Sequence, residues 1–296
     1  MEVLLSHSFD YLSSSSPQKI RKGLRQVEGL LAQICLSRSP PANKRHSIIS
    51  QGQQASPPSR KLANLRDDPA FREFFKLQQS FQCNVAIRLI SCLERLMGKG
   101  SNGQNDLLII STLELLQGVL LLHTPSRELF AREIHMNLLL DLLDPCNCPA
   151  IQSSTLLTLV STLLGQPGNT RTFESLDGLL VITALFKSRS TAREVKMKLV
   201  EFLYFYLMPE TPQMQPQMSA SASNTAVLGG RGRELVAAFE RNRRETIGGV
   251  DKANSESSQT RNTEEKQKML GKYLGNVDDL VEDLRESGGP FMGGAL

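Results

Sequence analysis

The chain has 296 residues, 40% of them hydrophobic, and a formal net charge of +4 at neutral pH. So small a charge excess gives no argument for a nucleic-acid partner, and no run of about 18 uninterrupted apolar residues predicts a membrane span. The start of the chain lacks the basic and apolar pattern of a signal peptide. Five cysteines, an odd number in a long chain, do not indicate a disulfide framework. We therefore expect a protein of a reducing cytoplasmic or nuclear setting.

Residues 1–36 are predicted to form an N-terminal basic helical segment. After a short apolar start, a helix is expected from Pro17 to Leu36 because apolar residues recur there at intervals of three and four. Residues 17–62 hold nine Lys or Arg against the single acid Glu28. This basic arm either binds an acidic partner or is a solvated end that keeps the protein soluble. Residues 37–64, rich in Pro, Ser and Gln, are predicted to be a disordered insert.

Residues 65–210 are predicted to form an armadillo-like helical repeat domain. When the sequence is aligned with itself at a shift of 43 residues, similar residues coincide. Leu113 and Leu116 then align with Leu156 and Leu159, and Phe130 aligns with Phe173. Self-similarity at about 40–47 residues is typical of armadillo and HEAT repeats, in which stacked helices share one core. The fold class is therefore all-α, an armadillo/HEAT-like solenoid. The expected helices span residues 70–80, 83–97, 107–123, 127–143, 150–164, 172–187 and 191–208.

Beyond the repeats, residues 211–262 are predicted to be a flexible linker and residues 287–296 a flexible tail. Between them, residues 263–286 read as one C-terminal amphipathic helix, with apolar residues spaced by three and four and an acidic opposite face. Gly271 and Gly275 weaken this helix by roughly 1 kcal/mol each relative to alanine. Its helicity should therefore depend on packing. The helix either folds back on the repeats or enters a groove of a partner.

The chain has few residues in patterns that support catalysis. We therefore expect that it is not an enzyme and that it has no cofactor or metal site. The four histidines, His7, His46, His123 and His135, lack any metal-binding spacing. Cys146 and Cys148 have no second cysteine pair with which to chelate a metal. No glycine-rich phosphate loop or serine-nucleophile motif occurs.

Two serines are candidate phosphorylation sites. Ser16 precedes Pro17 and a nearby lysine, a pattern that proline-directed kinases accept, and Ser47 follows a basic pair that basophilic kinases accept. Phosphate would change the charge of a flexible arm at either position. Patterns this short also arise by chance.

Two segments, KLVEFLYFYLMPET (198–211) and KQKMLGKYLGNVDDLVEDLRES (266–287), resemble the cell division control protein 14 family of the fungal septation initiation network. This family is unrelated to the phosphatase that shares its number. Cysteine phosphatases carry an arginine six positions after the nucleophilic cysteine, and no cysteine here has one. The resemblance covers most of residues 65–209 and the final helix.

The resemblance implies a non-catalytic adaptor that binds a germinal-centre-type protein kinase, reaches the spindle pole body with it, and supports septum formation and cytokinesis. The matched positions, which we infer to be partner-binding candidates, are Glu201, Tyr204, Tyr206, Pro209, Glu210, Leu274, Asp278, Asp279, Leu280 and Leu284. For Tyr204 and Tyr206 a role as core aromatics is an equal alternative. The alternative function is a structural spindle-pole or cortical scaffold whose basic arm binds acidic filaments or lipid.

Overall fold

The computed structural model describes residues 1–36, 65, 67–98, 103–210, 260–279, 281 and 282. The predicted insert (37–64) and tail (287–296), and most of the predicted linker (211–262), lie outside these residues. Within the described residues the secondary structure is helical and contains no β-strand, so the predicted all-α class is confirmed. The helices are α1 Glu2–Leu12, α2 Pro17–Cys35, α4 Pro69–Gln78, α5 Val85–Met97, α6 Asp106–Leu122, η1 Thr124–Ala131, α7 Glu133–Asp141, α8 Pro149–Leu163, α9 Pro167–Ser175, α10 Gly178–Lys187, α11 Arg193–Leu207 and α14 Thr263–Leu270.

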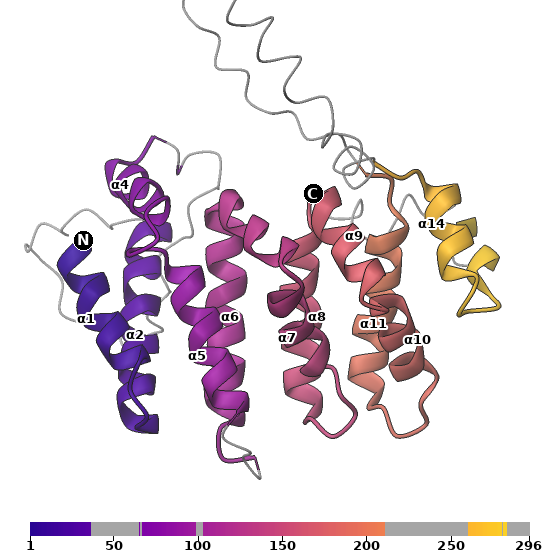
Figure 1. Ribbon diagram of the computed structural model, residues 1–296, viewed down its shortest axis with the longest axis horizontal. Helices are drawn as coiled ribbons and strands as arrows, with labels where there is room; N and C mark the ends of the chain where they lie inside the picture. Colours follow the sequence, from indigo (N-terminus) through magenta and orange to yellow (C-terminus); the bar gives the residue numbers. More distant parts are fainter. Residues whose placement is uncertain (37–64, 66, 99–102, 211–259, 280, 283–296) are drawn as a thin grey trace, which may run out of the picture.

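The helices form an elongated array in which α2, α6, α8 and α11 make a row (Figure 1), and each helix of the row packs against the next. Helix α1 packs on α2 at one end of this row, and α5 packs on α6 and on α1. The shorter elements η1, α7, α9 and α10 pack against one another and against α8 and α11. At the other end of the row, α14 packs on α11. The described part of the chain is therefore one succession of helices from α1 to α14.

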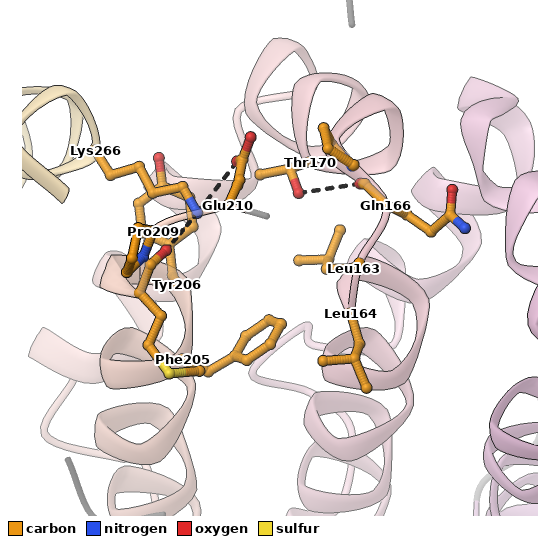
Figure 2. Close-up of a pocket in the computed structure, with 12 residues that line it drawn as sticks. Leu163, Leu164, Gln166, Thr170, Phe205, Tyr206, Pro209, Glu210 and Lys266 are labelled. Atoms are coloured by element: carbon orange, nitrogen blue, oxygen red, sulfur yellow. Dashed lines mark hydrogen bonds and ion pairs between the residues drawn. The ribbon is translucent and has the colours of Figure 1, made fainter. Parts of the chain in front are cut away.

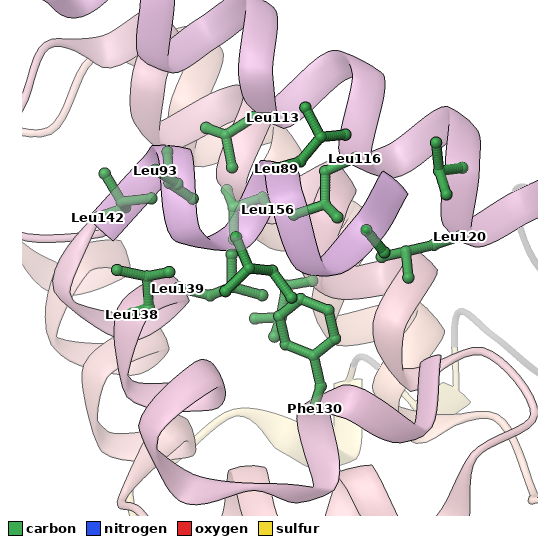
Figure 3. Packing of buried hydrophobic residues seen from close by; sticks show 14 of the residues in the cluster. Leu89, Leu93, Leu113, Leu116, Leu120, Phe130, Leu138, Leu139, Leu142 and Leu156 are labelled. Carbon is green, nitrogen blue, oxygen red and sulfur yellow. The ribbon is translucent and has the colours of Figure 1, made fainter. Parts of the chain in front are cut away.

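One hydrophobic core runs through the array. Figure 3 shows its middle, where Leu113 and Leu116 of α6 meet Leu89 of α5, Leu156 of α8 and Phe130 of η1. All five side chains are buried. Burying a leucine contributes roughly 2 kcal/mol, so a chain of such contacts dominates the folding free energy.

The starts of two helices show why the sequence folds locally as it does. Asp68 accepts hydrogen bonds from the backbone N–H groups of Ala70 (2.7 Å) and Phe71 (3.3 Å), and Pro69 occupies the first turn of α4. Asn84 likewise caps α5. Capping side chains satisfy backbone donors that have no partner inside the helix, and proline is tolerated at the first position.

Two predicted helices are each divided in the structure. The segment expected as one helix over 127–143 consists of η1 and α7, separated by Arg132 in an extended conformation. The segment expected over 172–187 is interrupted between α9 and α10 by Asp177, which is left-handed at φ 57°. Gly178 follows because a Cβ there would lie 2.2 Å from the ring of Phe173. Apolar periodicity continues across such a corner, so it did not reveal the break.

Polar contacts between neighbouring units repeat at a spacing close to the 43-residue shift. Asn84 Nδ2 donates to Ser126 Oγ (3.2 Å), and Asn169 Nδ2 donates to the backbone oxygen of Arg127 (2.8 Å), each across 42 residues. Thr158 Oγ1 donates to the oxygen of Leu113 (3.3 Å) across 45 residues. Asn169 and Thr158 satisfy backbone oxygens of the preceding unit, and Asn84 donates to a hydroxyl of the following one, which fixes the register between units.

Within the described residues no single helix is long and apolar enough to cross a membrane. Helices α6 and η1 satisfy that length and composition only as a pair, and the pair is bent by 117° at its junction.

Replacing Gly178 with alanine should destabilise the protein. The new Cβ would collide with the Phe173 ring and with the Phe173 backbone oxygen, at 2.2 and 2.6 Å. Relieving that overlap should lower the free energy of unfolding, measured with urea, by about 1–3 kcal/mol. The control is Gly168→Ala in α9, where a Cβ meets nothing within 4 Å. It should leave stability unchanged or raise it by up to about 1 kcal/mol. Equal stabilities of the two variants would contradict this packing.

The free energy of unfolding should depend on pH because of His123. Its ring is buried, its Nδ1 lies 2.8 Å from Ser126 Oγ, and burial lowers its pKa to about 4. Between pH 6.5 and 4 the unfolded state binds a proton that the folded state does not bind. Stability therefore falls as pH falls through this range, by about 2 kcal/mol at pH 5 relative to pH 7. In His123→Asn, which does not titrate, this part of the pH dependence of urea unfolding should disappear. An identical pH profile for the two proteins would refute the assignment.

Candidate interaction site at the C-terminal end of the array

The end of the row is closed by the C-terminal segment. Leu270, Leu274, Val277 and Val281 are buried, and α14 packs on α11. Lys187 Nζ of α10 also donates to the backbone oxygen of Tyr273 (2.5 Å). The sequence allowed two positions for this segment, folded back on the repeats or docked on a partner. In the structure it folds back.

The predicted continuous helix over 263–286 is not observed in the described residues. Helix α14 ends at Leu270, a turn covers residues 271–276, and helical residues resume at Val277. Gly271 is the C-cap residue of α14, and Gly275 lies in the turn. The low helix propensity of glycine, which predicted a weak helix, here allows the chain to turn while its apolar residues stay on α11.

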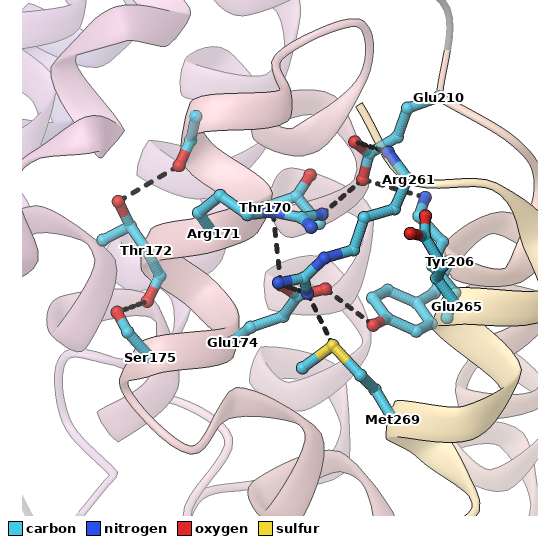
Figure 4. Close-up of polar contacts among 12 residues, drawn as sticks. Thr170, Arg171, Thr172, Glu174, Ser175, Tyr206, Glu210, Arg261, Glu265 and Met269 are labelled. Atoms are coloured by element: carbon cyan, nitrogen blue, oxygen red, sulfur yellow. Dashed lines mark hydrogen bonds and ion pairs between the residues drawn. The ribbon is translucent and has the colours of Figure 1, made fainter. Parts of the chain in front are cut away.

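Glu174 of α9 is one of two buried carboxylates in this junction (Figure 4). It lies 3.2 Å from Arg171 Nε and forms an ion pair with Arg261 Nη1. Tyr206 donates its hydroxyl to Glu174 Oε1 (2.7 Å). The carboxylate side chain is only 4% exposed, so its charge is compensated by these groups rather than by water.

Glu210, just after α11, is the second buried carboxylate. It accepts from Arg171 Nη2 (2.5 Å) and pairs with Lys266 Nζ (3.1 Å). The backbone N–H of Arg261 donates to Glu210 Oε2 (3.0 Å), and the backbone N–H of Glu210 donates to the oxygen of Arg261 (3.0 Å). Charge-assisted and backbone bonds thus join the end of α11 to the residues that precede α14.

Lys266 and Tyr206 meet inside the same junction. Lys266 Nζ donates to the backbone oxygen of Met208 (2.9 Å) and lies 5.2 Å from the centre of the Tyr206 ring. Burial lowers the pKa of Lys266, and Glu210 opposes that effect. Burial, reinforced by Glu174, raises the pKa of Tyr206, so its hydroxyl remains a protonated donor. We name Arg171, Glu174, Tyr206, Glu210, Arg261 and Lys266 the terminal clamp.

A cavity of about 350 Å³ lies between the C-terminal ends of α8 and α11, beside the terminal clamp (Figure 2). Leu163, Leu164, Phe205 and Met208 give it apolar walls. The remaining residues that line it are Gly165, Gln166, Pro167, Thr170, Tyr206, Pro209, Glu210 and Lys266. Among the residues that the structure describes, no three His, Cys, Asp or Glu side chains are grouped to hold a metal ion.

A third feature is an exposed stripe of apolar side chains on the central row. Its large members are Leu107 and Leu121 of α6, Leu157 of α8, Leu164 directly after α8, and Met197 of α11. Residues 114, 157 and 200 occupy equivalent places under the 43-residue shift, so the three helices present equivalent sides. Helix α8 carries no charged residue at all. We name this stripe the apolar face.

The structure separates the predicted partner-binding residues into two groups. Tyr206, Glu210 and Leu274 lie in the junction between α11 and the C-terminal segment. Pro209, Asp278 and Asp279 are exposed, while Glu201 and Tyr204 are half-buried on α11. Glu201 pairs with Lys198 (2.7 Å), and Asp278 accepts from Gln267 (2.5 Å). Leu280 and Leu284, with the candidate phosphosite Ser47, lie outside the described residues. Ser16 is the half-buried N-cap residue of α2.

Sequence reasoning missed the rest of the terminal clamp. Arg171 and Glu174 stand three residues apart, which a pattern search reads as an ordinary helix-surface pair. Nothing local shows that Arg261, 87 residues beyond Glu174, joins them. The predicted start of the C-terminal helix at residue 263 agrees with α14, where Asn262 and Glu265 form a capping box.

These features define an all-helical protein that closes a row of packed helices with its own C-terminal segment and leaves an apolar face uncovered. The chain matches over residues 1–291 the model of the family described as "Cell division control protein 14, SIN component", and it belongs to this family. It is 27% identical over 293 residues to "Cell division control protein 14" of Schizosaccharomyces pombe, covering 96% of this chain and 94% of that protein. No solved structure matches the chain. The family inferred from two sequence segments is thereby confirmed, and the chain is a septation initiation network component involved in cell division.

Removing the carboxylate of Glu174 should strongly destabilise the end of the array. Glu174→Ala leaves Arg171, Arg261 and the Tyr206 hydroxyl without their shared acceptor, which costs about 3 kcal/mol or more in chemical unfolding. Glu201→Ala is the matched control, because its pair with Lys198 is 44% and 37% exposed. That variant should change stability by no more than about 0.5 kcal/mol. A small effect at Glu174 would mean that the terminal clamp does not hold the segment in solution.

Proposed function

We propose that this chain is a non-catalytic adaptor that binds a germinal-centre-type protein kinase of the septation initiation network through its apolar face. The kinase class and the non-catalytic role come from the family resemblance. The observation that supports this surface is the exposure of Leu107, Leu157 and Met197, at 70%, 38% and 60%, on three successive helices of one row. Contiguous exposed apolar side chains mark surfaces that bind other proteins.

The chemistry of the apolar face fits a stable protein interface better than a solvated surface. The residues of its middle helix, α8, that are exposed to water are all uncharged and include Ser, Leu and Val. Interface cores are depleted in charge, and their rims are polar. The neighbouring helices add charged groups that a partner could pair with: Arg193 and Glu194 lie one turn before Met197 on α11, and Glu114 lies between Leu107 and Leu121 on α6. A partner that covers three helices has room for the area of about 1,000 Å² that a specific interface needs.

The repeat architecture supports the same proposal. We infer that the row is an armadillo/HEAT-like solenoid, because the 43-residue self-similarity coincides with hydrogen bonds across 42 and 45 residues. Solenoids stack units in one dimension and thereby present extended surfaces. Under this reading the partner recognises the apolar face, while Tyr206, Glu210 and Leu274 act indirectly by holding the last unit together. Glu201, Tyr204, Pro209, Asp278 and Asp279, which are half-buried or exposed, are proposed to contact the kinase as well, and so are Leu280 and Leu284.

The proposed setting is the cytoplasm and the spindle pole body, where the adaptor would place or support the kinase during septum formation. A structural scaffold remains the second candidate. Lys19, Arg21 and Arg25 are exposed on the first half of α2 and form a basic surface suited to acidic filaments or lipid. Salt-sensitive sedimentation with microtubules or anionic vesicles, lost on replacing these three residues with glutamine, would favour the scaffold.

Introducing charge on the apolar face should abolish capture of the kinase. Leu157→Asp combined with Met197→Asp places two carboxylates in the proposed interface core without touching buried residues. Affinity purification from dividing fungal cells, read by kinase identity and activity, should recover at least tenfold less kinase with this variant. Circular dichroism should be unchanged.

The control for this experiment is Leu180→Asp, which alters a 47% exposed leucine on α10, outside the central row. It should capture the kinase as the unaltered chain does. Kinase recovery that is equal for the double variant and the control would refute the proposed surface.

A further inference from the structure

The cavity between α8 and α11 joins an apolar wall to a buried ammonium group. Leu164, Phe205 and Met208 form the wall, and Lys266 lies at one end beside Glu210 (Figure 2). Its volume of about 350 Å³ is at the lower end of the range, about 300–1,000 Å³, that small-ligand pockets occupy. The space suits one or two amino-acid residues.

Lys266 has capacity for one more acceptor. An ammonium group has three N–H donors. The described residues offer it two oxygens, the Met208 carbonyl at 2.9 Å and Glu210 Oε1 at 3.1 Å. The Tyr206 ring, 5.2 Å away, is an additional weak partner. A carboxylate oxygen in the cavity would complete the set with a charge-assisted hydrogen bond.

The terminal clamp also carries an excess positive charge. It contains three cations, Arg171, Arg261 and Lys266, against two carboxylates, Glu174 and Glu210. Burial lowers the pKa of Lys266, which is the expected consequence of holding a cation away from water. Of these five charged residues, Lys266 and Glu210 line the cavity, and the net positive charge of the whole cluster favours an anion there over a neutral ligand.

We propose that the cavity binds an acidic–apolar residue pair in an internal segment of a partner protein. The apolar side chain packs among Leu164, Phe205 and Met208, and the neighbouring carboxylate accepts from Lys266. Leu164 is 41% exposed and also belongs to the apolar face, so a segment seated here continues along that face. The inference rests on the proposed function in one respect: the segment is taken to belong to the partner that covers the apolar face.

The test uses the full chain labelled at its methionine methyl groups and two blocked dipeptides, acetyl-Leu-Asp-amide and acetyl-Leu-Asn-amide. Because Met208 lines the cavity, its NMR signal should shift on titration with the aspartate peptide. The asparagine peptide, equal in shape but neutral, should bind about tenfold more weakly. Lys266→Met should make the two affinities equal. No shift of the Met208 signal, or equal affinities for the unaltered chain, would overturn the proposal.

A second variant keeps the test independent of the stability of the terminal clamp. Leu164→Trp fills the cavity from its exposed side and should block both peptides, whereas Leu180→Trp on α10 should bind them normally. Peptide binding that survives Leu164→Trp would place the site elsewhere. The titration contains no kinase, so loss of kinase capture with intact peptide binding refutes only the proposed function. Kinase capture with no peptide binding refutes only this inference.

Discussion

Helices α6 and α8, and the second half of α11, are apolar around most of their circumference, and the rest of the structure depends on how they are covered. Helix α8 is covered on both flanks by α6 and α11 and on a third side by η1 and α9. Among the described residues no further helix of the row follows α11, and the C-terminal segment packs on α11 in that place. Each covered side contributes folding free energy through burial, whereas the uncovered sides of α6, α8 and α11 form the apolar face.

The terminal clamp explains how a short segment, distant in the sequence, finds one position on α11. Apolar residues such as Leu270 and Val277 supply burial, but burial alone is not directional. Two buried carboxylates shared among three cations and a tyrosine fix the register, because any other alignment would leave buried charges unpaired. The same junction creates the cavity, so the end of the apolar face is built partly from the C-terminal segment.

Much of the fold could be predicted from the sequence, because each unit buries its leucines at intervals that local periodicity reveals. The corners at Arg132 and Asp177 could not, since apolar spacing continues across them and only a backbone angle or a close contact at Gly178 marks the break. For the site, the segments 198–211 and 266–287, which contain Glu210 and Lys266, both carry the family resemblance. Their mutual contact could not be predicted, because ion pairs across a long insertion leave no spacing signal.

The proposed function requires that a partner covers the apolar face. Hydroxyl-radical footprinting of the full chain, with and without the co-purified kinase, tests this most directly, because Met197 is 60% exposed and its sulfur oxidises readily. Kinase binding should protect Met197 and Leu157, while Phe81, 71% exposed in the turn before α5, should be oxidised equally in both samples. Unchanged oxidation of Met197 and Leu157 in the complex, or protection confined to α1 and α2, would contradict the proposed function.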